Sequence, residues 1–120
     1  MTSVLVVDGA NVVGSVPDGW WRDRAGAARR LHERLLVADT DWDQIVLVLE
    51  GAAKGGVRAG TDGHVRTVHA PRDGDSAIRE EARQALDAGA RVVVVTADRA
   101  LAANVSPAQV LSPSWLLDRL

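Results

Sequence analysis

The sequence predicts a three-layer α/β/α domain built on a mostly parallel sheet of four or five strands. Short runs of Val, Ile and Leu alternate along the chain with longer segments in which apolar residues recur at helical spacing. The short runs are apolar at nearly every position, as in strands that are covered on both faces. Because 120 residues suit one compact core, we expect residues 1–120 to form a single domain.

The expected strands are the places where β-branched and other apolar residues cluster. They lie at residues 3–7, 45–49, 65–68 and 92–95, with a small fifth strand at 109–111. Long helices are expected at residues 25–36 and 78–88, where the apolar residues have helical spacing. A short helix is expected at 98–103, and Ser112 and Pro113 suit the start of a last one. The glycine-containing segments 8–24 and 51–63 are expected to be loops.

Composition and charge narrow the functional classes that fit this chain. The formal net charge of -2 does not suit a protein that coats nucleic acid non-specifically. Cysteine is absent, so a metal would need oxygen or histidine ligands, which favours Mg²⁺ or Mn²⁺ over soft metals. No apolar run approaches the ~18 residues of a membrane span, and no signal-peptide pattern is visible. We therefore expect a cytoplasmic protein without a membrane partner.

Acidic residues follow the strongest strand candidates. Asp8, Glu50 and Asp98 stand at or just after the ends of three expected strands, and Asp73 and Asp75 precede the second long helix. Because the carboxyl ends of parallel strands share one edge of a sheet, these acids are expected to converge. Two carboxylates ~4 Å apart repel by about 4 kcal/mol near a protein surface. A divalent cation would relieve that repulsion and supply hydrolytic chemistry.

Each of these residues also has a purely structural interpretation. Asp8 could end its strand in a turn, and Asp75 and Asp98 could cap helices. Glu50 precedes a glycine loop and could be solvated. Asn11 could orient Asp8, a water or a phosphate, or could serve as a turn residue. The joint pattern, with an acid at the same edge of each major strand, is less common than any one cap.

Several short motifs, taken in order, resemble those of a known family. Residues 6–14 (VVDGANVVG), 74–78 (GDSAI) and 96–99 (TADR) resemble the acidic motifs of NYN-domain proteins, in the PIN-like nuclease superfamily. Residues 48–50 (VLE) are similar to a strand that ends in an acid in the bacterial branch of this group. The resemblance implies a PIN-like, Rossmann-like fold that extends over nearly the whole chain.

The resemblance also implies an activity and a set of site residues. It implies a hydrolase, a Mg²⁺- or Mn²⁺-dependent endoribonuclease that binds RNA, with single-stranded RNA as the expected form. Asp8, Asp75 and Asp98 would be the catalytic metal ligands, and Asn11 and Glu50 would assist them. A homodimer and an association with ribosomes are further partner states that the sequence leaves open.

One position departs from the family pattern. Many relatives have two adjacent acids where this chain has Asp75 followed by Ser76, and a serine supplies no charge. Asp73 could compensate, or a second metal position could be weak or lost. The departure therefore keeps open an adaptor that binds nucleic acid with reduced or no catalysis.

Basic and aromatic residues near the motifs are candidates for binding the substrate. Lys54 and Arg58, in the glycine-rich segment, could bind phosphates. Arg72 and Arg99 adjoin the proposed site acids and could hold the phosphate to be cut, or could form ion pairs with those acids. The tryptophans at 20 and 21 could stack on bases, although anchoring their loop on the core is the preferred interpretation.

Two other enzyme or binding classes remain as alternatives. Residues 9–14 (GANVVG) after a strand nearly match a dinucleotide-binding fingerprint, but Asn11 replaces the middle glycine and would crowd a pyrophosphate. The same carboxylate site could also hydrolyse a nucleotide or a small phosphoester instead of RNA.

Overall fold

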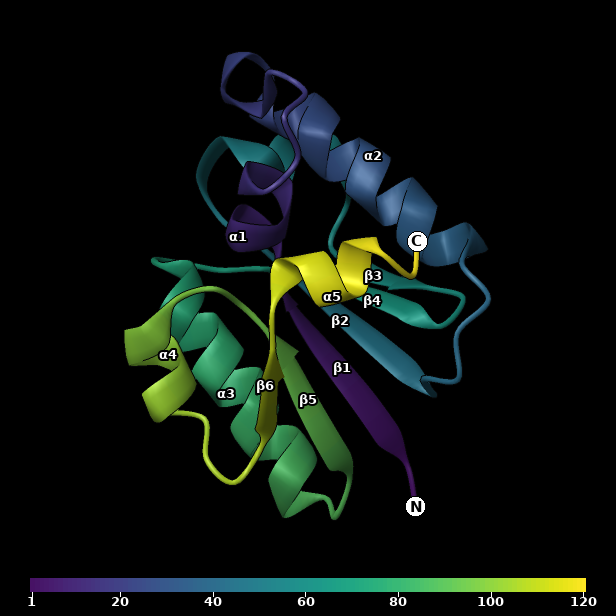
Figure 1. Cartoon of the computed structure of the whole chain (residues 1–120), viewed down its shortest axis with the longest axis vertical. Coiled ribbons are helices and arrows are strands. Elements are labelled where there is room, and N and C mark those ends of the chain that lie inside the picture. The colour runs from purple at the N-terminus through teal and green to yellow at the C-terminus, as the bar shows by residue number, and fades with distance from the viewer.

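A six-stranded sheet runs through the computed structural model, which describes residues 1–120 (Figure 1). The strands lie in the order β3-β4-β2-β1-β5-β6, and every neighbouring pair is parallel except β3 with β4. Their bounds are β1 (Ser3–Asp8), β2 (Gln44–Leu49), β3 (Gly60–Asp62), β4 (Val65–His69), β5 (Arg91–Val95) and β6 (Gln109–Leu111). All five expected strands are present, and β3 is an additional one.

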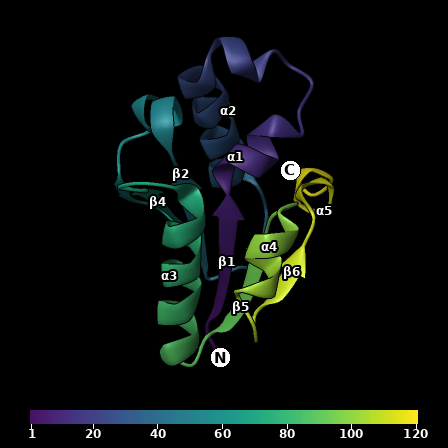
Figure 2. The same cartoon turned by 90° about the vertical axis from the view of Figure 1, so that its left-hand side faces the viewer.

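Helices cover both faces of the sheet, as Figures 1 and 2 show from two directions. One face carries α1 (Gly9–Gly14), α2 (Arg24–Val37) and α5 (Pro113–Leu117). The other face carries α3 (Gly74–Asp87) and α4 (Arg99–Ala103). Two short 3-10 helices, η1 (Trp20–Arg22) and η2 (Gly51–Gly56), complete the set. The three-layer α/β/α prediction is therefore confirmed.

The centre of the sheet is apolar on both faces, which explains the unbroken runs of Val and Leu. Leu5, Val6 and Val7 of β1 are fully buried. Because side chains alternate along a strand, Leu5 and Val7 join the core under α1, α2 and α5, whereas Val6 joins the core under α3 and α4. Burial of each such side chain stabilises the fold by about 1.5–3 kcal/mol.

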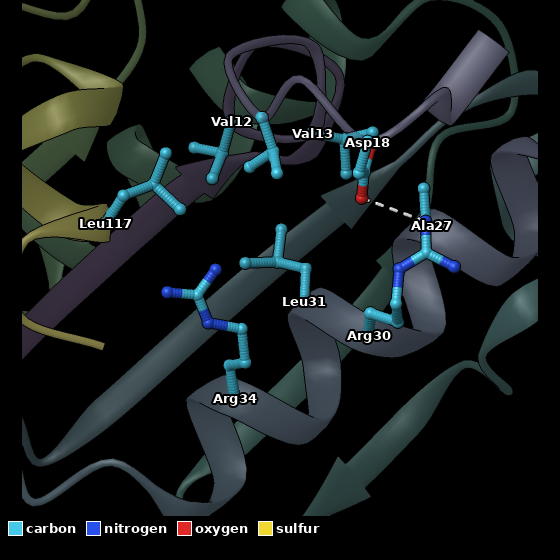
Figure 3. A pocket seen from close by; sticks show the side chains of 9 residues that line it. Val12, Val13, Asp18, Ala27, Arg30, Leu31, Arg34 and Leu117 are labelled. Atoms are coloured by element: carbon cyan, nitrogen blue, oxygen red, sulfur yellow. Dashed lines mark hydrogen bonds and ion pairs between the residues drawn. The ribbon is translucent and has the colours of Figure 1, made fainter.

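The first helix is held in place by α2 and α5. Figure 3 shows Val12 and Val13 of α1 facing Leu31 of α2, with Leu117 of α5 beside them, around a small cavity of ~100 Å³. An ion pair between Arg30 and Asp18, with 2.9 Å between the guanidinium nitrogen and the carboxylate oxygen, ties the following loop to α2 (Figure 3). This packing fixes the turn that carries the first acidic motif.

Two segments that were expected to be loops contain regular structure, so those predictions were wrong. Helix α1 begins directly after β1, because Gly9 allows a close approach: a Cβ there would lie 2.5 Å from the carbonyl oxygen of Val48. The segment after Glu50 forms η2 and β3, and Gly56 packs directly against the backbone of Ala25 in α2. Gly9 and Gly56 thus allow close backbone packing in the two segments.

The order of the strands reverses at β1. The chain passes from β1 to β2 and β4 on one side, and α3 then returns it to β5 and β6 on the other side. In sheets of this type, ligands bind beyond the carboxyl ends of the strands at such a reversal. The ends of β1, β2 and β5 are therefore the place to examine for a site. None of the helices has the length and apolar character needed to cross a membrane.

Candidate active site at the carboxyl edge of the sheet

Asp8 is the buried acid at the centre of this edge. It ends β1 and is 4% exposed. One carboxylate oxygen, Oδ2, accepts hydrogen bonds from the side-chain amide of Asn11 and from the hydroxyl of Thr96, both at 2.7 Å. The other oxygen, Oδ1, accepts from the backbone N–H of Asn11 at 3.3 Å, which caps α1. Asp8 therefore has a fixed orientation, which Asn11 and Thr96 hold together.

Thr96 links two of the predicted acids, and the sequence had not singled it out. It follows β5, is 4% exposed, and its hydroxyl donates a hydrogen bond to Asp8. The same oxygen accepts the backbone N–H of Asp98 at 3.1 Å. The ends of β1 and β5 are thus joined through one buried hydroxyl. The only sequence signal for this role is its place in the 96–99 motif.

Two further acids cap helices at the same edge. Asp98 caps α4 by accepting the N–H of Leu101 at 3.0 Å on Oδ1. Asp73 caps α3 by accepting the N–H of Ser76 at 2.7 Å and its hydroxyl at 3.2 Å. These bonds from Ser76 lower the pKa of Asp73, which keeps it ionised. Ser76 therefore completes the cap and occupies both carboxylate oxygens of Asp73.

Glu50 joins the end of β2 to the start of α3. Its Oε2 accepts the backbone N–H of Gly74 at 2.8 Å, and a Cβ on Gly74 would lie 3.2 Å from the carboxylate. The interpretation of Glu50 as a simply solvated acid is therefore wrong. The bond holds the first turn of α3 against the strand ends.

Asp75 lies in that first turn, and it is the one acid of this group whose carboxylate accepts no hydrogen bond. Its pKa is raised, first by partial burial and then by the charges of the surrounding carboxylates, which are those of Asp98, Asp8, Asp73 and Glu50. All the predicted acids thus act electrostatically on one position. It is Asp73, and not Asp75, that caps α3.

The carboxylates are suitable ligands for Mg²⁺ or Mn²⁺, but they do not form a finished ligand cage. No group of three or more His, Asp or Glu side chains lies close enough together to hold an ion. The acids differ in how many of their oxygen lone pairs are free to bind an ion, because Asp8 already accepts three hydrogen bonds while Asp75 accepts none. Carboxylate oxygens with space for water are the donor set that these cations prefer.

The predicted substrate-binding cations lie in different places. Asp8, Glu50, Asp73, Asp75 and Asp98 together form what we call the acidic edge. Arg72 lines a pocket of ~380 Å³ that also includes Glu50, so it adjoins this edge. Arg99 is exposed at the start of α4, next to Asp98. Lys54 lies on η2 and Arg58 shortly after it, and neither lines that pocket. Sequence reasoning missed Arg24, which lines the pocket from the start of α2.

Comparisons with known proteins agree with the architecture and go no further. No family model and no curated protein matches the chain. Among solved structures, the chain is similar to a crystal structure of a point mutant of Rae1 (YacP) from Bacillus subtilis, with a TM-score of 0.66 and 18% identity. The match covers 98% of this chain and 74% of the other. The chain therefore shares its three-layer α/β/α fold with that structure.

Proposed function

We propose that the chain is a Mg²⁺- or Mn²⁺-dependent endoribonuclease whose carboxylates at the carboxyl edge of the sheet hold the ion. The observation that carries this proposal is the convergence of acids from separate elements. Asp8 from β1, Asp98 before α4 and Asp75 from α3 share the edge where the strand order reverses, and the charges of Asp98 and Asp8 act on Asp75. An uncompensated cluster of like charges is costly, and a divalent cation is its usual counterpart in phosphodiester hydrolysis.

In this proposal the chain's own residues hold and orient the ligands. Asn11 and Thr96 fix the carboxylate of Asp8. Glu50 fixes the first turn of α3 and thereby places Asp75 near the strand ends. A bound ion would polarise a phosphoryl oxygen and lower the pKa of a water. Partial burial and the neighbouring carboxylates raise the pKa of Asp75, and a bound cation would favour its ionised form.

We further propose a site for a single ion. The serine at position 76 provides no carboxylate, and Asp73 has both oxygens occupied by Ser76 in the α3 cap. A metal that turned Asp73 away from these two bonds would cost the helix cap, which contributes about 1 kcal/mol. This arrangement differs from that of the NYN-domain proteins, which the motifs resemble and many of which have two adjacent acids at this point.

The test is cleavage of end-labelled single-stranded RNA with Mn²⁺, with Mg²⁺ and with EDTA. Asp98→Asn removes a proposed ligand, and Asp118→Asn is the matched control, because Asp118 is an exposed acid at the end of α5. We expect metal-dependent cleavage that persists in the Asp118 variant and falls by at least 100-fold in the Asp98 variant, as on loss of an electrostatic stabiliser. Equal cleavage by both variants would refute the assigned site.

A nucleic-acid-binding adaptor is the second candidate. It is favoured by the absence of a formed ligand cage and by Ser76 in place of a second acid. RNA binding by folded wild-type protein, without cleavage of several RNAs in Mn²⁺, would support the adaptor over the nuclease.

A further inference from the structure

A pocket beside the acidic edge has a different character from the edge itself. It has a volume of ~380 Å³ and lies between α1, η1, the start of α2 and the start of η2. Its lining residues are Gly9, Ala10, Val13, Trp20, Arg24, Glu50, Gly51, Ala53 and Arg72. Because Glu50 belongs both to this pocket and to the acidic edge, a ligand in the pocket would lie next to the proposed metal site.

One wall of the pocket is a positioned aromatic ring. Trp20 is half-buried and packs against the core on the α2 face. Trp21 contacts it edge-on, with 5.9 Å between ring centroids, and the guanidinium of Arg24 lies over the Trp20 ring at 5.2 Å. The ring is thus held by its neighbours and lines the pocket, with the guanidinium of Arg24 over one of its faces. Val13 and Ala53 add apolar surface.

The pocket also carries positive charge that the chain itself does not neutralise. Arg30, Arg66 and Arg83 form ion pairs with carboxylates elsewhere in the structure. Arg24 and Arg72 have no carboxylate oxygen within the 4.0 Å that defines such a pair. The one acid in the pocket, Glu50, accepts the N–H of Gly74 through Oε2.

We propose that this pocket binds one unpaired nucleotide of an RNA strand, with its base stacked on Trp20 and a flanking phosphate held by Arg24 and Arg72. A flat aromatic wall, two guanidinium groups and an acceptor at Glu50 match a base, a phosphate and a base amino group respectively. The volume falls within the roughly 300–1,000 Å³ of small-ligand pockets. A phosphate alone would not use the aromatic wall, and an apolar peptide would leave both arginines unpaired.

One consequence of this pocket, the selection of single-stranded RNA for cleavage, rests on the proposed nuclease function. A base that is stacked and paired in a duplex cannot enter the pocket without leaving the helix, which costs a few kcal/mol. The strand bound at the acidic edge would therefore have to be single-stranded next to the phosphate that is cut. The pocket would thus be the element that selects single-stranded RNA.

The test is binding of a short single-stranded RNA that contains 2-aminopurine, in EDTA so that nothing is cleaved. Stacking on Trp20 should quench the 2-aminopurine emission, and Trp20→Ala should weaken binding about 5- to 100-fold and abolish the quenching. Trp21→Ala is the matched control. Trp21 is 57% exposed and does not line the pocket, so its loss should leave binding within about twofold of the wild type.

Two further variants, Arg72→Gln and Trp20→Phe, test the pocket if Trp20→Ala does not fold. Arg72→Gln changes an exposed residue without an ion pair, and should weaken binding and reduce the salt dependence by about one phosphate contact. Trp20→Phe should keep most of the stacking. Wild-type affinity and salt dependence in Arg72→Gln, or wild-type affinity and quenching in a folded Trp20→Ala protein, would overturn the pocket assignment.

The outcomes separate this inference from the nuclease proposal. Cleavage in Mn²⁺ together with binding that does not depend on Trp20 or Arg72 would refute the pocket and leave the nuclease intact. Trp20-dependent binding without any cleavage would support the pocket and refute the nuclease.

Discussion

Replacement of Thr96 by valine tests whether the acidic edge is held together as the structure indicates. The change is nearly isosteric and removes only the hydroxyl that donates to Asp8 at 2.7 Å and accepts the N–H of Asp98 at 3.1 Å. Thr96 and Asp8 are each 4% exposed, so little water can replace the lost donor. The variant thus leaves a buried carboxylate with one fewer hydrogen bond.

The expected cost follows from the type of bond that is lost. A hydrogen bond to a charged group contributes about 1.5–3 kcal/mol. The N–H of Asp98 adds little, because that residue is partly exposed and its N–H can bond to water. We therefore expect Thr96→Val to lower the free energy of unfolding by about 1.5–3 kcal/mol. A domain of this size has about 5–15 kcal/mol of stability, so the variant should remain folded.

Urea unfolding followed by circular dichroism measures this cost. With an m-value of about 1.5–2 kcal/mol/M, the midpoint should fall by roughly 1–2 M, while the slope stays unchanged. Thr67→Val is the matched control, since Thr67 is 3% exposed and its hydroxyl has no hydrogen-bond partner. Its loss should be neutral or stabilising. Equal midpoints for the two variants would refute the role given to Thr96.

Three further predictions concern the acidic edge and the helices that frame it. Because the folded-state pKa of Asp75 is raised above 3.8, ionised Asp75 destabilises the fold as pH rises above 3.8. Asp75→Asn should therefore unfold at a higher temperature than the wild type at pH 7 without metal, and a gain that does not shrink as pH falls toward 3.8 would contradict this. Gly9→Ala should lower the free energy of chemical unfolding by about 1–3 kcal/mol, because the added Cβ would lie 2.5 Å from a backbone oxygen. Gly14→Ala is the control: its Cβ would lie 3.8 Å from the nearest atom, so the loss should be under about 1 kcal/mol. Leu31 of α2 is 5% exposed and faces α1, so Leu31→Ala should lower the free energy of unfolding by about 2–5 kcal/mol. A loss under about 1 kcal/mol would mean that α1 is not packed as described.

The sheet could be predicted from the sequence because its strands are locally distinctive. Runs such as residues 92–95 (VVVV) are suited to strands buried on both faces and to little else. The short strand β3 could not be predicted, because Gly60–Asp62 is exposed throughout and becomes a strand only by pairing with β4. Helix α1 was hidden for a related reason. Its six residues begin and end with glycine, which locally favours a turn, and packing on α2 outweighs that preference.

The candidate site was predictable only where position along a strand was sufficient. Asp8, Glu50 and Asp98 were found because each follows a strand, and parallel strands share an edge. The bridging role of Thr96 depends on the pairing of β1 with β5, which sequence spacing does not contain. Arg24 escaped notice because it is remote in sequence from every acidic motif and reaches the site only through the packing of α2.

Binding of Mn²⁺ tests the central claim most directly, since it asks whether the acidic edge holds an ion. The electron paramagnetic resonance signal of free Mn²⁺ can be followed as wild-type protein, Asp75→Asn and Asp118→Asn are titrated. We expect one bound ion in the wild type and in the Asp118 variant, and an affinity at least tenfold weaker in Asp75→Asn. Wild-type protein that binds no Mn²⁺, or equal binding by Asp75→Asn, would contradict the claim that these carboxylates form a metal site.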